Sequence, residues 1–250
     1  MQSTRAIFEA HQGNLIHKWQ HYFEIYDRHF AQFIGKEVHL LEIGVSQGGS
    51  IQMWKKFFGP NLHYYGIDIN PGCKQFEEEN VTIFIGSQED PVFLKKVKDQ
   101  IPELDIFIDD GGHTMRQQIV SFEHLFEKVK NQGLYLCEDN HTSYWFNFGG
   151  GMKRKGTYIE YVKNLIDVMH LWYAGDKTRI YNHSLKDQMF AIHVYDSIVV
   201  IEKRKVAAPK DIKAGNYTVG YLDEDKPSLF QRVSHLFFKI KNRIRSMRYS

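Results

Sequence analysis

The chain has 250 residues, which is enough for one ordinary α/β domain and short for two. Apolar residues make up 42% and charged residues 25%, which excludes a wholly disordered chain, a collagen-like repeat and a disulfide-stapled scaffold. The formal net charge of +2 is unevenly spread, because residues 227–250 contain six basic and no acidic residues, which leaves a net charge of −4 on residues 1–226. The body is therefore not typical of a nucleic-acid-binding protein, and no nucleic-acid partner is expected.

Neither the cysteines nor the apolar residues indicate export or a membrane span. Cys73 and Cys137 form no CxxC pair and have no metal-binding spacing. Residues 1–15 lack the apolar run of a signal peptide, and no apolar run approaches the ~18–20 residues of a membrane-spanning helix. We therefore expect a cytoplasmic protein.

Residues 1–36 are predicted to be a helical segment. Its apolar residues recur at spacings of three and four, which places them on one helix face: Ile16, Trp19, Tyr22, Phe23, Tyr26 and Phe30. This helix could pack on the domain, or it could be a lid whose aromatic side chains line a ligand pocket.

Residues 37–205 are predicted to form one α/β domain. Short apolar runs that indicate strands cover residues 38–45, 63–69, 81–87, 104–110 and 133–139. Segments of helical period lie between them at 50–58, 91–100 and 115–130, an alternation typical of a parallel sheet. After a predicted helix at 157–169, residues 189–195 and 197–203 read as a hairpin. We expect the Rossmann-like fold of class I methyltransferases, a mostly parallel seven-stranded sheet with helices on both faces and a C-terminal antiparallel hairpin, although such a fold carries no function by itself.

Residues 206–250 are predicted to be a linker followed by a basic amphipathic helix. Apolar residues recur at helical spacing from Leu229 to Ile244, with basic residues such as Arg232 and Lys239 between them. This helix could pack on a second subunit, remain solvated, or lie on an anionic membrane surface. A second subunit is the preferred interpretation, so a homo-oligomer is expected and membrane contact is the less favoured alternative.

The first predicted strand leads into a glycine-containing turn with the spacing E-x-G-x-x-x-G. This spacing differs from the GxGxxG of dinucleotide-binding folds and suits the methionine part of S-adenosylmethionine, although an ordinary strand–turn–helix junction could also produce it. An acidic residue at the end of the second strand could accept hydrogen bonds from ribose hydroxyls, and polar residues after the third could meet the adenine edge. The predicted cofactor-binding residues are Glu42, Gly44, Gly48, Asp68, Ser87, Gln88 and Asp110.

Acidic residues also follow the fourth and fifth predicted strands. Adjacent strand ends open on the same crevice, so we expect Asp110, Glu138 and Asp139 to lie close together. Three carboxylates in one crevice repel one another unless a cation neutralises them, and Mg²⁺ prefers such oxygen ligands. His113 is the predicted general base, with His141 as a competitor. Alternatively, these acidic residues could cap the helices that follow, and Asp109 is expected to point to the opposite face of the sheet.

Several motifs, taken together and in this order, resemble the macrocin O-methyltransferase family. They are the run Ile108-Asp109-Asp110-Gly111-Gly112-His113, the pair Glu138-Asp139, the run His141-Thr142-Ser143-Tyr144-Trp145 and the leading Lys18-Trp19 with Tyr22 and Tyr26. The resemblance covers about residues 15–205 and departs from the family pattern at Ile16-His17 and at Gly112.

The resemblance implies transfer of a methyl group from S-adenosylmethionine to a sugar hydroxyl, with Mg²⁺ as the metal. Matched residue by residue, it implies metal ligands at Asp110, Glu138 and Asp139 and a base at His113. The aromatic residues of the following loop, Tyr144, Trp145 and Phe146, would close over the acceptor.

Three other functions stay open at this point. A catechol or other phenol could be the acceptor of the same metal-dependent reaction. An NAD-dependent oxidoreductase is disfavoured by the glycine spacing. The chain could also be a non-catalytic ligand-binding protein or a membrane-tethered interaction protein.

Overall fold

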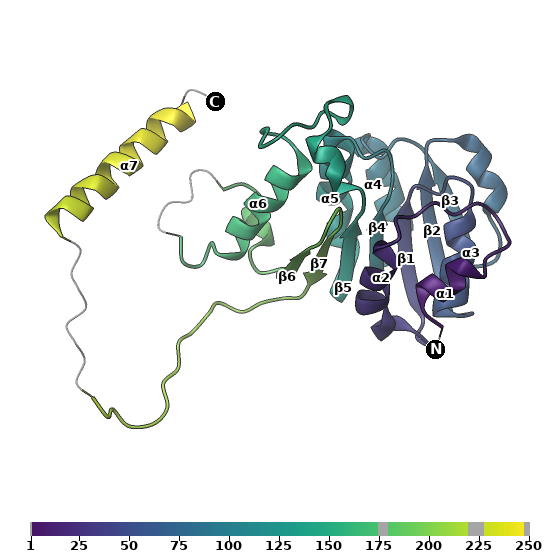
Figure 1. Ribbon diagram of the computed structural model, residues 1–250, viewed down its shortest axis with the longest axis horizontal. Helices are drawn as coiled ribbons and strands as arrows, with labels where there is room; N and C mark the ends of the chain where they lie inside the picture. Colours follow the sequence, from purple (N-terminus) through teal and green to yellow (C-terminus); the bar gives the residue numbers. More distant parts are fainter. Residues whose placement is uncertain (1, 175–179, 220–227, 248–250) are drawn as a thin grey trace.

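The computed structural model describes residues 2–174, 180–219 and 228–247, and in it one twisted sheet forms the centre of the molecule (Figure 1). The seven strands have the order β3-β2-β1-β4-β5-β7-β6. β1 to β5 are parallel, whereas β7 is antiparallel to both β5 and β6. The strands are β1 (Val38–Ile43), β2 (Leu62–Asp68), β3 (Val81–Ile85), β4 (Leu104–Asp109), β5 (Val129–Cys137), β6 (Met189–Val194) and β7 (Val199–Lys203). The predicted fold class, including the C-terminal antiparallel hairpin, is confirmed.

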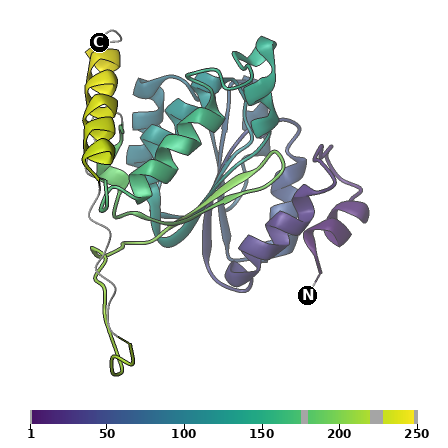
Figure 2. The same ribbon diagram turned by 60° about the vertical axis from the view of Figure 1, so that its left-hand side comes forward.

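Helices cover both faces of this sheet (Figures 1 and 2). The helices are α1 (Thr4–Glu9), α2 (Tyr22–Phe30), α3 (Gly49–Phe58), α4 (Pro91–Gln100), α5 (Met115–Leu125), α6 (Tyr158–Met169) and α7 (Leu229–Met247). The buried residues of α1, α2 and α3 share one apolar core with Val38 and Leu40 of β1. Those of α4, α5 and α6 share the other core with Leu41 and Ile43. Successive β1 residues thus serve opposite faces, as the strand period of two requires.

The register of the parallel strands aligns the ends that carry the polar residues. Ile43 of β1 pairs with Asp109 of β4, and Asp109 pairs with Cys137 of β5. The residues that follow each strand, including Asp110 and Glu138, therefore emerge at the same edge of the sheet. This is the edge at which open α/β sheets bind ligands.

The prediction of one continuous helical segment over residues 1–36 is wrong. Helix α1 ends at Glu9, residues 10–21 form no helix, and α2 begins at Tyr22. The intervening segment lies against α3 so closely that a Cβ on Gly49 would be 2.3 Å from the Leu15 carbonyl oxygen. Contacts with α3 therefore override the helical pattern, and only the apolar residues from Tyr22 onward are buried on a helix face, as expected.

The elements after β4 follow the predicted boundaries with one correction. The helix expected over 115–130 ends at Leu125, because a 3₁₀ turn at Phe126–Lys128 leads into β5. Residues 206–219 form no helix or strand, and α7 begins at the predicted Leu229. In the described part of the chain, no helix has the length and apolar character needed to cross a membrane.

Candidate functional site

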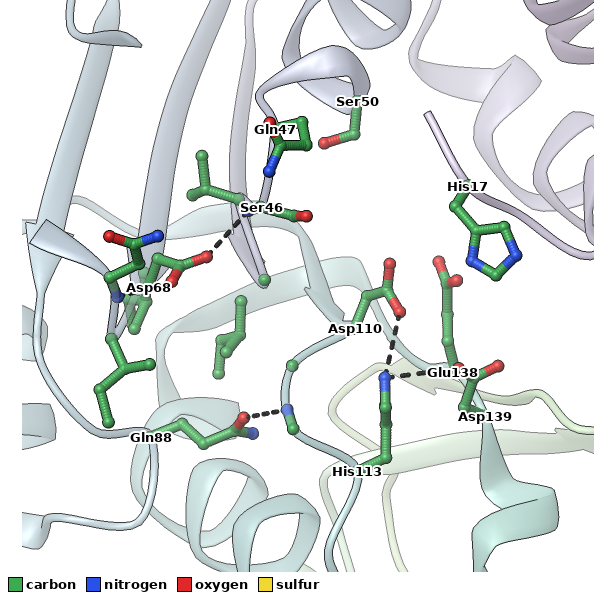
Figure 3. A pocket seen from close by; sticks show the side chains of 18 of the residues that line it. His17, Ser46, Gln47, Ser50, Asp68, Gln88, Asp110, His113, Glu138 and Asp139 are labelled. Atoms are coloured by element: carbon green, nitrogen blue, oxygen red, sulfur yellow. Dashed lines mark hydrogen bonds and ion pairs between the residues drawn. The ribbon is translucent and has the colours of Figure 1, made fainter. Parts of the chain in front are cut away.

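A cavity of about 480 Å³ opens at the carboxyl ends of the parallel strands (Figure 3). Gly44, Ser46 and Asp68 line one end, and Asp110, His113 and Asp139 line the other. The non-helical segment before α2 completes the wall with residues Leu15 to Trp19. One continuous cavity thus joins the predicted cofactor end to the predicted reaction end.

The turn after β1 is held by Asp68. Its Oδ2 accepts a hydrogen bond from the Ser46 amide at 2.8 Å, and its Oδ1 accepts one from the Asn70 amide at 2.8 Å. Gly44 has a φ of +97°, and a Cβ there would lie 1.9 Å from the Asp110 carbonyl oxygen. Glycine is required at position 44, because the turns after β1 and β4 cross there without room for a side chain.

Two of the predicted cofactor-binding residues do not line the cavity. The Glu42 carboxylate is fully buried and accepts hydrogen bonds from Ser50 Oγ, Trp54 Nε1 and Tyr64 OH, at 2.7, 3.3 and 2.6 Å. Its burial raises its pKa. The predicted direct contact is therefore corrected: Glu42 fixes α3 and β2 to β1.

Gly48 is the second of these residues. It adopts φ +76° at the N-terminus of α3, and a Cβ there would lie 2.9 Å from the ring of Phe76. Gly48 therefore makes room for a packed side chain of the protein, and its predicted approach to the cofactor is corrected in the same way.

Gln88 lines the cavity, but its amide is already engaged. Its Nε2 donates to Asp109 Oδ1 at 3.0 Å, and its Oε1 accepts from the Gly112 amide at 2.7 Å. Gln88 thus holds the turns after β3 and β4 together, and a contact of the partly exposed Ser87 with the adenine edge stays a prediction.

Asp109 points away from the cavity, as predicted from strand alternation. It is 1% exposed and accepts hydrogen bonds from Gln88 and Ser121. Burial raises its pKa from 3.8 to about 7. The folded chain therefore keeps this carboxyl protonated below about pH 7, in a range where a free aspartate is already ionised.

This burial gives a testable pH dependence of stability. As pH rises from about 4 to about 7, the unfolded carboxyl ionises while the folded one stays protonated, so Asp109 destabilises the fold progressively and by a constant amount above that range. Asp109→Asn mimics the protonated form, so urea unfolding should show it gaining stability over wild type as pH rises through this window. The gain should reach up to about 4 kcal/mol, at about 1.4 kcal/mol per pKa unit. The exposed control Glu103→Gln should show no such trend, and an effect of Asp109→Asn that is constant at all pH values would contradict the assignment.

Asp110, His113 and Asp139 converge at the reaction end of the cavity. One potential ligand atom from each lies within 4.8 Å of the other two. His113 Nε2 is 3.3 Å from Asp139 Oδ2 and 3.9 Å from Asp110 Oδ1 (Figure 3). The second Asp139 oxygen accepts a hydrogen bond from Tyr22 OH at 2.6 Å. Three of the four predicted metal-and-base residues thus face one another.

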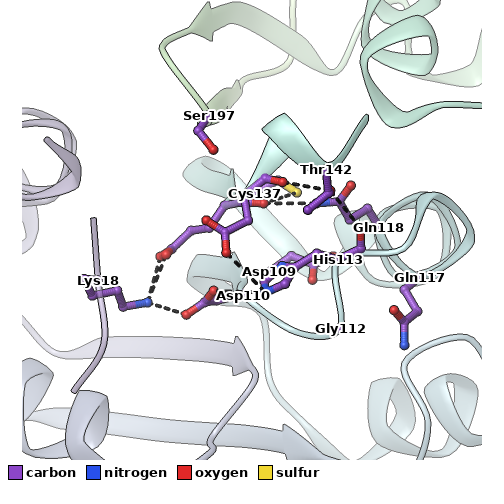
Figure 4. A network of polar contacts seen from close by, with 12 residues as sticks. Lys18, Asp109, Asp110, Gly112, His113, Gln117, Gln118, Cys137, Thr142 and Ser197 are labelled. Carbon is purple, nitrogen blue, oxygen red and sulfur yellow. Dashed lines mark hydrogen bonds and ion pairs between the residues drawn. The ribbon is translucent and has the colours of Figure 1, made fainter. Parts of the chain in front are cut away.

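Glu138, the fourth of these residues, accepts hydrogen bonds from Lys18, whose side chain is labelled in Figure 4. Lys18 Nζ lies 3.0 Å from both Glu138 oxygens and 2.5 Å from Asp110 Oδ2, with only 3% of its side chain exposed. Tyr26 OH donates to the same Glu138 carboxylate at 2.7 Å. Burial raises the pKa of Glu138, and the neighbouring Lys18 opposes that rise.

Sequence reasoning missed Lys18 as the partner of these carboxylates. The carboxylates of Asp110 and Glu138 do repel each other, as expected, but the ammonium group of Lys18 compensates part of this repulsion. The one available signal was the Lys18-Trp19 pair among the family motifs, because Lys18 lies far from the strand ends in sequence.

The donor set fits a hard divalent cation. Asp110 Oδ1 and Asp139 Oδ2 face the same space, and Mg²⁺ is commonly held by one or two carboxylates with water or substrate completing its shell. Both Glu138 oxygens face Lys18, so Glu138 could become a direct ligand only if Lys18 moved. Asp110 and Asp139 are therefore the stronger candidate ligands.

The chain is similar to several sugar O-methyltransferases. It is 37% identical over 189 residues to the demethylmacrocin O-methyltransferase of Streptomyces fradiae and 35% identical over 189 residues to the mycinamicin VI 2''-O-methyltransferase of Micromonospora griseorubida. In each case the match covers 71% of this chain and 47% of the relative. The MycE methyltransferase of the mycinamycin biosynthetic pathway, solved in complex with Mg and SAH, is 32% identical with a TM-score of 0.67, covering 76% of this chain and 51% of that one. No family model matches.

The resemblance to the macrocin-type methyltransferases is confirmed. The chain spans about half the length of the curated relatives that it matches.

His141 is less well placed than His113 to act on a ligand in the cavity. Its Nδ1 lies 2.5 Å from Ser197 Oγ, and its ring packs against Trp19 and Trp145. It is not among the residues that line the cavity, whereas His113 is.

The predicted acceptor loop follows β5 and is largely solvent-exposed. Tyr144 and Trp145 are about half exposed, and Phe146 is 83% exposed. None of the three lines the cavity, so closure of this loop over an acceptor stays a prediction. Trp19, which does line the cavity, contacts the His141 ring and joins this aromatic surface to the cavity wall.

Proposed function

We propose that this chain is an S-adenosylmethionine- and Mg²⁺-dependent O-methyltransferase that methylates a hydroxyl group of a sugar or glycosylated natural product. The observation that carries the proposal is the single cavity that connects Asp68 and the glycine turn to Asp110, Asp139 and His113. The relatives support it, because MycE has been solved with Mg, SAH and mycinamycin VI, and other relatives are named as methyltransferases of rhamnosyl and olivosyl compounds. A cytoplasmic location and homo-oligomeric assembly stay predictions.

The cofactor end would hold the adenosyl and methionine groups. Asp68 lies on the cavity wall, and two backbone amides fix its carboxylate. The carboxylate is therefore positioned to accept hydrogen bonds from the ribose hydroxyls without a change of its own conformation. When bound, S-adenosylmethionine supplies the electrophilic methyl group. Gly44 and Ser46 allow the backbone to approach the methionine part.

The reaction end would bind and deprotonate the acceptor. Asp110 and Asp139 would hold Mg²⁺, which lowers the pKa of a hydroxyl bound to it. His113 would take the hydroxyl proton on Nε2, the ring nitrogen that faces the two carboxylates. Once Nε2 carries that proton, Asp139 would stabilise the imidazolium, and Tyr22 would in turn hold Asp139. Most of the catalytic effect would come from positioning, which is worth ~7–11 kcal/mol in well-oriented systems.

Metal removal tests the proposed function directly. EDTA is expected to abolish methyl transfer to a glycoside acceptor, and added Mg²⁺ should restore it, with turnover followed by mass spectrometry. An acceptor panel containing sugars and catechols would separate the sugar enzyme from its phenol-methylating alternative. Full turnover in EDTA would contradict the metal mechanism.

The cofactor assignment gives a separate prediction. Asp68→Ala should weaken binding of S-adenosylhomocysteine by more than tenfold in calorimetry, because a hydrogen bond to a charged group contributes about 1.5–3 kcal/mol. Asp90→Ala, which removes the exposed N-cap of α4, is the matched control and should leave affinity unchanged. Tight binding of NAD, with none of S-adenosylhomocysteine, would overturn the assignment in favour of an oxidoreductase.

A further inference from the structure

Helix α7 presents an apolar face that nothing in the described part of the chain covers. Leu229, Val233, Leu236 and Ile240 are spaced by four, three and four residues, which places them in one row along the helix. Phe230 and Phe237, seven residues apart, form a second row beside it. These six side chains are between 42% and 82% exposed, so the face is an unpartnered apolar surface on a chain that buries its other large apolar clusters.

Cationic residues accompany this face. Arg232 and Lys239 are also seven residues apart and lie within four positions of Leu236, so they border the apolar row. In the sequence from residue 227 to 250, all six residues with a full charge are Lys or Arg. This combination matches the boundary between the acyl chains and the anionic headgroups of a bilayer, where the long basic side chains reach the phosphates.

The charge of α7 favours a bilayer over a second copy of the helix as the partner that covers its apolar face. Pairing α7 with its own copy would bring together ten cationic residues and no acidic ones, since each copy contributes five and none. Anionic lipids instead attract each basic residue near the surface, and the attraction is screened by salt. The cationic residues also explain why α7 would lie in the plane of the membrane, in agreement with the absence of a spanning helix in the described part of the chain.

We propose that α7 is an interfacial anchor that binds an anionic lipid bilayer. Residues 206–219, which are exposed and form no helix or strand, connect the α/β body to the segment that carries this anchor. The anchor is separate from the candidate active site, so its function does not depend on the proposed reaction.

Vesicle flotation of the full chain tests this proposal. The chain should bind vesicles of phosphatidylcholine and phosphatidylglycerol at least tenfold better than vesicles of phosphatidylcholine alone, and high salt should reduce the difference. Phe230→Ser/Phe237→Ser should abolish binding, and Arg232→Gln/Lys239→Gln should weaken it and its salt dependence. The control Val194→Ser removes an apolar side chain that is 57% exposed on β6 and should leave binding unchanged. All variants should keep the wild-type circular-dichroism spectrum and melting temperature, which shows that the body is folded.

Two results would overturn the anchor. One is the absence of binding to anionic vesicles, or equal binding to both kinds. The other is that Phe230→Ser/Phe237→Ser converts an oligomer to a monomer in light scattering while vesicle binding is unchanged, which would make α7 a subunit interface.

Discussion

His113→Ala is expected to lower the rate of methyl transfer by ~10²–10⁴-fold, the usual contribution of a positioned general base. The variant removes the imidazole whose Nε2 lies 3.3 Å from Asp139, and it leaves both candidate metal-binding carboxylates in place. Binding of S-adenosylhomocysteine and of Mg²⁺, measured by calorimetry, should therefore change little. Single-turnover kinetics with saturating acceptor would isolate the loss in the chemical step.

The matched control is His141→Ala. His141 is the other histidine near Asp139, but its Nδ1 is paired with Ser197 and it does not line the cavity. Its removal should cost much less in rate than removal of His113. A near-normal rate in His113→Ala, together with a large loss in His141→Ala, would move the base to His141.

Lys18→Met is expected to destabilise the fold by about 3–5 kcal/mol, the usual cost of leaving buried charges without their partner. Lys18 is the cation that Asp110, Glu138 and Glu42 share, at 2.5, 3.0 and 3.9 Å. Without it, burial and Asp110 would raise the pKa of Glu138 further. Urea unfolding in EDTA would measure the loss, and added Mg²⁺ should recover part of it if a bound cation can replace the ammonium charge.

The matched control for this variant is Lys95→Met. It also breaks a lysine–carboxylate pair, with Asp99 at 2.7 Å, but both side chains are more than half exposed. Its effect should be far smaller, since solvent screens surface pairs. Equal effects of the two substitutions would show that Lys18 is not a buried counter-charge.

The sequence predicted the sheet well because its strands are local patterns. Apolar runs located all seven strands to within a few residues, and the parallel order correctly predicted Asp110 and Asp139 at one edge of the sheet. Strand alternation also separated Asp109 from Asp110 correctly. These predictions succeeded because each depends on residues that are close together in the chain.

Predictions failed where partners come from distant segments. Glu42 and Gly48 fitted a ligand-binding turn, but the side chains that surround them, Tyr64 and Phe76, come from other elements. Lys18 contacts Glu138 across 120 positions of sequence, and no spacing rule reveals such a pair. The apolar period of residues 16–30 indicated one helix, but packing on α3 keeps its first part non-helical.

Residues 14–16 pass so close to Gly49 that a substitution at position 49 should also affect Lys18. Any side chain at position 49 would push residues 14–16 away from α3, since its Cβ would lie 2.3 Å from the Leu15 carbonyl oxygen. Lys18 follows three residues later, so the same displacement would withdraw the ammonium group from the carboxylates. The effects of substitutions at positions 49 and 18 on stability should therefore be non-additive. A side chain at 49 already removes the charge compensation that Lys18 supplies to the carboxylates.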